Sequence, residues 1–156
     1  MHQRSFEKAA LRGIKTSSDR NLAAPVSKPL FSSDTPHLAK GMLGEDTAAA
    51  YLENIGFILI GRNIRTGRCE IDILAKDRDE IVFVEVRTRS RGWIMSASES
   101  VGPKKIANLM QAAGRWAEMR NYCGFWRIDL VAVTLEDGKE PLVEHIRNIT
   151  EPLENE

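Results

Sequence analysis

Hydrophobic and polar positions follow a helical period near residue 42 and a strand period soon afterwards. Residues 42–55 place Ala48, Leu52 and Ile55 at spacings of three and four, which predicts a helix with these side chains on its inner face. Glu45 lies three residues before Ala48 and falls on the same face. The pattern therefore directs one carboxylate toward whatever this helix covers.

Apolar segments of strand length follow the first helix. They are residues 57–60, 69–75, 81–88 and 125–133, with a weaker edge strand at 142–146. The short polar link 77–80 predicts an antiparallel hairpin that pairs Lys76 with Ile81. This register places Asp72 opposite Glu85.

A second helix is predicted from Pro103, a residue that often begins helices, to Arg120. Its apolar face is formed by Ile106, Leu109, Met110, Ala113 and Ala117. The element order is then α-β-β-β-α-β-β, which predicts an α/β fold with a central mixed β-sheet flanked by α-helices.

Composition divides the chain into a tail, a domain and an acidic end. Residues 1–38 are rich in Pro, Ser and Thr without a sustained period, and they predict a flexible tail. Residues 39–150 are expected to form one domain, followed by an acidic end at 151–156. The 22 Lys and Arg balance the 22 Asp and Glu, which excludes a uniformly basic coat protein of nucleic acids.

The compartment is predicted from cysteine usage and from hydropathy. Two cysteines, Cys69 and Cys123, are too few for a disulfide framework, and a cytoplasmic location is expected. No apolar run reaches the length of a membrane span, so no membrane partner is expected.

Asp72 and Glu85 are unusual for strands because carboxylates directly opposed across a hairpin repel one another. A divalent cation, a shared proton or a neighbouring arginine can offset the repulsion, and the cation is the simplest solution. Mg²⁺ or Mn²⁺ prefers oxygen ligands, and Glu45 is a candidate third ligand.

Three motifs, taken together, resemble a known family. They are Gly44-Glu45 before an Ala-rich helix, Glu70-Ile71-Asp72-Ile73-Leu74, and Val82-Phe83-Val84-Glu85-Val86-Arg87-Thr88-Arg89. The set resembles the YraN-like family of small bacterial proteins over residues 40–148. That family is similar to the restriction-endonuclease-like PD-(D/E)xK superfamily, close to the Holliday-junction resolvases.

The resemblance implies metal-dependent hydrolysis of phosphodiester bonds. Asp72 and Glu85 match the acidic pair that holds Mg²⁺ or Mn²⁺, Glu45 matches the helix acid of resolvase-like members, and homodimers are suggested by analogy. Arg87 stands where the superfamily usually has Lys. Arginine can stabilise charge on a phosphorane, but it stays protonated and cannot act as a base.

Basic residues near the carboxylates are the candidate contacts to nucleic acid. Arg89, Arg91, Lys104 and Lys105 are predicted to bind phosphate, and Trp93 can stack on a base. For the arginines, neutralisation of nearby acids is an equal alternative, and Glu70 is expected to pair with Arg87 or Arg89.

Other residues have structural interpretations. Trp116 and Cys123 are expected in the core, and His145 on the surface of the edge strand. Arg127 and Asp129 share a strand face and are able to pair.

The sequence thus predicts a metal-dependent, structure-selective DNA endonuclease, with DNA favoured over RNA. The alternatives are a non-catalytic nucleic-acid-binding module on the same scaffold, which Arg87 favours, and a protein-interaction scaffold that uses the tail and the acidic end.

Overall fold

The computed structural model describes residues 36–92 and 94–151 of the chain. Most of the predicted tail, Trp93 and most of the acidic end lie outside these ranges. The element order is α2 (Pro36–Asn54), β1 (Ile58–Thr66), β2 (Cys69–Asp77), β3 (Glu80–Ser90), the 3₁₀ turn η1 (Ser98–Ser100), α3 (Pro103–Met119), β4 (Trp126–Leu135) and β5 (Leu142–Ile146). The predicted order of helices and strands is confirmed.

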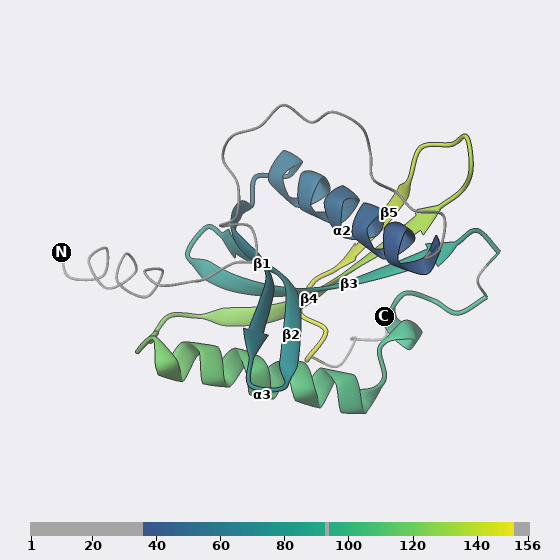
Figure 1. The fold of residues 1–156 in the computed structure, drawn as a ribbon. Helices are drawn as coiled ribbons and strands as arrows, with labels where there is room; N and C mark the ends of the chain where they lie inside the picture. The colour runs from purple at the N-terminus through teal and green to yellow at the C-terminus, as the bar shows by residue number, and fades with distance from the viewer. Residues whose placement is uncertain (1–35, 93, 152–156) are drawn as a thin grey trace.

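One mixed sheet of five strands, in the order β1-β2-β3-β4-β5, forms the centre of the fold. Strands β3 and β4 are parallel and are joined through α3, whereas the other neighbours are antiparallel. Helix α2 covers one face of the sheet and α3 covers the other (Figure 1). The predicted α/β class, with a central mixed sheet flanked by helices, is therefore confirmed.

Each face of the sheet has its own hydrophobic core. Under α2, the fully buried residues include Ala48, Leu52 and Val84, which confirms two of the three inner positions predicted for this helix. Ile55 is 41% exposed because α2 ends at Asn54, one residue before it. Helix α2 also begins six residues earlier than predicted, at Pro36.

Beneath α3 the core centres on aromatic residues. Trp116 is buried as predicted, and its ring meets Phe83 edge-on at 5.5 Å between centroids. Met110, predicted for this core, is 45% exposed, and Ala112 is buried in its place. The buried face of α3 is therefore rotated slightly from the predicted one.

Two further predictions are wrong. Cys123 is exposed because it lies in the loop that leads into β4, outside both cores. The His145 side chain is only 5% exposed: Nε2 lies 2.9 Å from Oδ2 of Asp129, and the ring packs edge-on against Tyr51 and Phe57. Long-range partners on α2 and β4 cover this edge-strand position, and the alternation of β5 does not reveal them.

Within the described part of the chain, no helix is long and apolar enough to cross a membrane.

Candidate functional site

Strands β2 and β3 part just where the two predicted carboxylates lie. The register pairs Lys76 with Ile81, as predicted, and continues to Ile73 opposite Val84. Beyond this pair, Oδ2 of Asp72 accepts a 2.7 Å hydrogen bond from the backbone N–H of Val86. The Asp72 side chain thus bridges the two strands at the point where their ladder ends.

Glu85 is buried on the next position of β3, with only 3% of its surface exposed. Its Oε1 lies 3.3 Å from Nη2 of Arg87, and its Oε2 lies 3.0 Å from Nζ of Lys105 on α3. The lysine contact lacks hydrogen-bond geometry, so Oε2 is buried without a hydrogen bond from the described residues. The Lys105 ammonium offsets part of the cost of burying this carboxylate, while no aligned hydrogen-bond donor from the described residues reaches Oε2.

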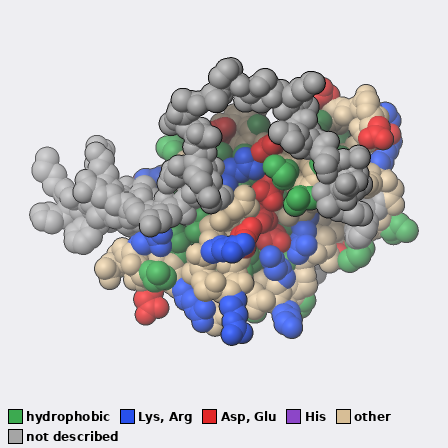
Figure 2. All heavy atoms as spheres, in the orientation of Figure 1, with side chains coloured by type: hydrophobic (Ala, Val, Ile, Leu, Met, Phe, Trp, Pro, Cys, Tyr) green, Lys and Arg blue, Asp and Glu red, His purple; other side chains and the backbone are tan. Residues whose placement is uncertain are grey.

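Burial and the nearby Glu85 carboxylate raise the pKa of Asp72 to about 7, against the lowering effect of the Val86 N–H. Glu45 raises this pKa further and Lys105 lowers it, both to a smaller extent. Negative charge is therefore concentrated around Asp72. Figure 2 shows Asp and Glu side chains gathered between α2 and α3, with Lys and Arg side chains on either side.

Glu45 lies near this pair but is held by other partners. Its Oε2 accepts a 3.3 Å hydrogen bond from Nδ2 of Asn63 and lies 3.6 Å from Nη2 of Arg62. Among residues 36–92 and 94–151, no three His, Cys, Asp or Glu side chains form a group able to hold a metal ion. The structure therefore does not gather Glu45 with Asp72 and Glu85 as a third ligand.

Gly44 allows α2 to approach β3 closely beside Glu45. A Cβ at this position would lie 1.8 Å from Oγ1 and 2.8 Å from Cβ of Thr88. Only glycine fits this contact without movement of the helix. The Gly44-Glu45 motif thus combines close packing with the placement of a carboxylate.

Gly44→Ala is expected to destabilise the protein by about 1–3 kcal/mol, because the added methyl group pushes α2 away from β3. Gly41→Ala, in the same helix with open space around the new Cβ, is the matched control. It is expected to stabilise the protein by up to about 1 kcal/mol through helix propensity. Chemical unfolding of both variants measures the difference, and equal effects would contradict the proposed close contact.

The basic residues predicted to bind phosphate are separated by the structure. Arg89 donates to Thr134, to the Met95 carbonyl and to Glu144, and Arg91 lies 2.6 Å from Glu136. These two arginines are thus engaged with groups of β4, of β5 and of the segments that follow β3 and β4, in line with the alternative of charge neutralisation.

Closer to the two carboxylates, the observed contacts of the basic residues and of Glu70 also differ from the predicted ones. Lys105 contacts Glu85, whereas Lys104 is exposed and makes no ion pair with the described residues. Glu70 pairs with Arg65 at 3.1 Å, so its predicted pairing with Arg87 or Arg89 is wrong. The cause is the length of β1, which continues to Thr66 and brings Arg65 directly opposite Glu70.

Two hollows adjoin the α3 face of the sheet. One is a polar groove of about 680 Å³ between the β1–β2 hairpin and α3, and Asp72 and Lys105 are among its lining residues. Arg68, Asn108, Gln111 and Arg115 also line it; the sequence analysis missed them, although on α3 the last three recur at helical spacing.

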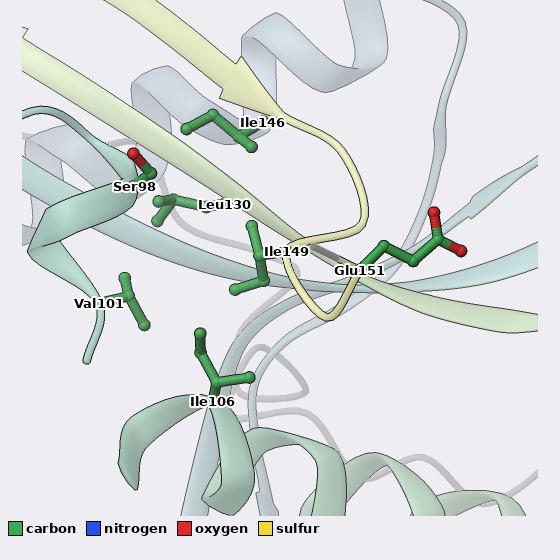
Figure 3. A pocket seen from close by; sticks show the side chains of 7 residues that line it. All are labelled: Ser98, Val101, Ile106, Leu130, Ile146, Ile149 and Glu151. Carbon is green, nitrogen blue, oxygen red and sulfur yellow. The ribbon is translucent and has the colours of Figure 1, made fainter. Parts of the chain in front are cut away.

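The other hollow is a cavity of about 180 Å³ near the start of α3. Val101, Ile106, Leu130 and Ile149 face one another across it, while the carboxylate of Glu151 points away (Figure 3). Its apolar lining carries no candidate chemistry.

A five-stranded mixed sheet with a helix on each face, in the order α-β-β-β-α-β-β, is a restriction-endonuclease-like α/β fold. The model described as "Uncharacterised protein family UPF0102" matches residues 44–133. The chain belongs to this family, which confirms the resemblance to YraN-like proteins.

Relatives named "UPF0102 protein" support this assignment. The protein of Anaeromyxobacter dehalogenans is 44% identical over 110 residues, covering 69% of this chain and 80% of the relative. That of Pseudarthrobacter chlorophenolicus is 38% identical over 112 residues, covering 71% and 85%. The protein of Oleidesulfovibrio alaskensis is 40% identical over 115 residues, but the match spans only 55% of that longer relative.

Among solved structures, SfsA of Pyrococcus furiosus in complex with Ca²⁺ is similar at 16% identity with a TM-score of 0.33. The match covers 70% of this chain and 63% of that protein.

Proposed function

We propose that this protein is a metal-dependent, structure-selective endonuclease that binds DNA and hydrolyses its phosphodiester bonds. The observation that carries the proposal is the pair of Asp72 and Glu85 at the parting strands. One carboxylate has its pKa raised by burial and by the other, and Oε2 of the second is buried without a hydrogen bond from the described residues. Together they offer two carboxylates to a divalent cation, which would share Glu85 with Lys105 and Arg87.

The two carboxylates fit Mg²⁺ or Mn²⁺ as ligands. Magnesium is commonly held by one or two carboxylates, with water and substrate phosphate at the other positions, so a third protein carboxylate is not required. Such an ion, when bound, supplies a water of lowered pKa and positive charge for the phosphate. Glu45 contributes negative charge nearby, as its effect on Asp72 indicates.

Arg87 and Lys105 are the cationic groups beside these ligands. The Arg87 side chain is 40% exposed, so part of its guanidinium remains available to bind oxygens of the scissile phosphate. Lys105 reaches Glu85 from α3, on a separate element from Arg87. An ammonium can exchange a proton with the reacting groups, whereas a guanidinium cannot, so Lys105 supplies a function that Arg87 lacks.

The test is cleavage of labelled DNA junctions, flaps, single strands and duplexes by the full chain with Mg²⁺ or Mn²⁺, and with chelator as the blank. The protein is expected to cut at least one branched or single-stranded substrate. Asp72→Asn and Glu85→Gln are expected to reduce cleavage to the chelator level. Asp79→Asn removes an equivalent charge in the exposed β2–β3 turn and is expected to cut normally.

The second candidate is a non-catalytic nucleic-acid-binding module on the same scaffold. It is favoured by Arg87, which occupies the expected lysine position and contacts Glu85. Tight binding without cleavage of any substrate would reject the nuclease and support this module. Cleavage that persists in Asp72→Asn would also reject the proposed mechanism.

A further inference from the structure

The groove between the β1–β2 hairpin and α3 has the features of a binding site for an extended polymer. The hairpin lines it with residues 66–70 and Asp72, and α3 lines it with Lys105, Asn108, Gln111 and Arg115. Asp72 belongs both to this groove and to the candidate site. Whatever occupies the groove therefore approaches the proposed scissile position.

Polar side chains form a row along the groove side of α3. Lys105, Asn108, Gln111 and Arg115 follow one another at spacings of three, three and four residues, which places them along one side of a helix. Ten residues of helix extend about 15 Å, the length of about four stacked nucleotides at 3.4 Å each. This row thus offers a series of hydrogen-bond donors over the length of a short oligonucleotide.

The positive charges of the groove are available to a ligand. Arg68 and Arg115 are exposed, and neither forms an ion pair with any residue in the described part of the chain. Glu70, one of the two acids in the lining, already pairs with Arg65. An anionic chain is therefore the complementary occupant.

At Gly67 the hairpin turn meets α3 closely. This residue has a φ of +64°, and a Cβ built on it would lie 2.7 Å from Nη1 of Arg115. Arg115 is thus placed between the turn and the groove, ten residues along α3 from Lys105. Along α3 the groove accordingly has Lys105, paired with Glu85, toward one end, Arg115 toward the other, and the amides of Asn108 and Gln111 between them.

We propose that this groove binds a single nucleic-acid strand, with Arg68 and Arg115 on its phosphates and Asn108 and Gln111 on base or sugar groups. The inference rests on the proposed function and specifies its substrate-binding residues. The occupant is single-stranded because amides within a groove can reach base edges that are free of pairing partners. A duplex would present its backbone to the rim, with its bases already paired.

The test is the fluorescence anisotropy of a labelled single-stranded oligonucleotide of about twelve residues, titrated with the full chain in chelator at several salt concentrations. Arg68→Gln/Arg115→Gln is expected to weaken binding at least about tenfold. It is also expected to reduce the slope of log K against log salt by about 1.4, since each phosphate contact on a single strand contributes about 0.7. Asn108→Ala/Gln111→Ala is expected to weaken binding with little change in slope.

The matched control is Arg78→Gln, compared with Arg68→Gln alone, because Arg78 is also exposed, lies outside the groove lining and makes no ion pair with the described residues. It is expected to leave the slope unchanged. All variants are compared after their thermal unfolding has shown that they are folded.

The outcomes separate this inference from the proposed function. If the wild type binds DNA and the groove and control variants behave alike, the groove assignment is overturned while the proposed function stands. If a duplex of the same sequence or polyglutamate competes equally well, the single-strand assignment is overturned. If the wild type binds no nucleic acid, both proposals fall.

Discussion

Replacement of Arg127 by Met is expected to destabilise the protein by about 3–5 kcal/mol, because it leaves a buried carboxylate without its main partner. Asp129 is fully buried, and its Oδ1 lies 2.9 Å from Nε of Arg127. The same guanidinium pairs with Asp77 at 2.7 Å and with Glu80. Without Arg127, three acids face one another across the α2 side of the sheet.

The network also explains the protonation states of its members. Burial would raise the pKa of Asp129, but hydrogen bonds from His145, Arg127 and the Asn148 N–H together lower it below its ordinary value. Burial alone would lower the pKa of the Arg127 guanidinium, and its bonds to Asp129 and Asp77 reverse that direction. The interior therefore contains an ionised cluster that depends on a complete set of partners.

Thermal unfolding measures the stability lost in Arg127→Met. A decrease in Tm of about 10–20 °C is expected for a domain of this size. Arg65→Met is the control, because it breaks the exposed pair with Glu70 and is expected to cost less than about 1 kcal/mol. A Tm for Arg127→Met that equals that of the control would show that the cluster does not stabilise the fold.

Removal of the charge of Asp72 is expected to stabilise the metal-free protein, whereas Arg127→Met is expected to destabilise it. The pKa of this carboxyl is about 7 in the folded protein, against an ordinary value of 3.8. The folded state thus binds a proton more tightly than the unfolded chain, so stability decreases as the pH rises from about 4 to about 7. Above pH 7 the full penalty applies, of the order of 4 kcal/mol.

Asp72→Asn is therefore expected to stabilise the metal-free protein at pH 8 and to have little effect at pH 4. Its amide oxygen can still accept the Val86 N–H, so the strand contact is retained. Urea unfolding in chelator at both pH values measures this difference.

Glu85→Gln removes an equal charge but loses the contacts with Lys105 and Arg87, so no such gain is expected. If Asp72→Asn were less stable than the wild type at pH 8, the proposed concentration of negative charge would be contradicted.

Local sequence signals predicted the sheet register and the positions of the two central carboxylates. The alternation of β2 and the short turn after it determine that Lys76 pairs with Ile81, and this register places Asp72 and Glu85 one position beyond the Ile73–Val84 pair. Strand separation at that step was not predictable from alternation. It results from the Asp72 side chain, which takes the Val86 N–H that a backbone carbonyl would otherwise accept.

Contacts between distant segments account for the residues that sequence reasoning misplaced. His145 is buried by rings from α2 and from the turn after it, together with an acid from β4, and no local pattern of β5 encodes these partners. Arg89 is engaged because β4 and β5 bring Thr134 and Glu144 to its guanidinium. The groove likewise exists only because the β1–β2 hairpin packs against α3.

The central claim is that Asp72 and Glu85 together bind a divalent cation. Titration of the full chain with Mn²⁺ at pH 8, followed by thermal unfolding, tests it before any substrate is known. The wild type is expected to gain about 2.7 kcal/mol at a free Mn²⁺ concentration one hundred times the Kd, and Asp72→Asn and Glu85→Gln are expected to gain almost nothing. An equal gain in all three proteins, or none in the wild type, would contradict the claim.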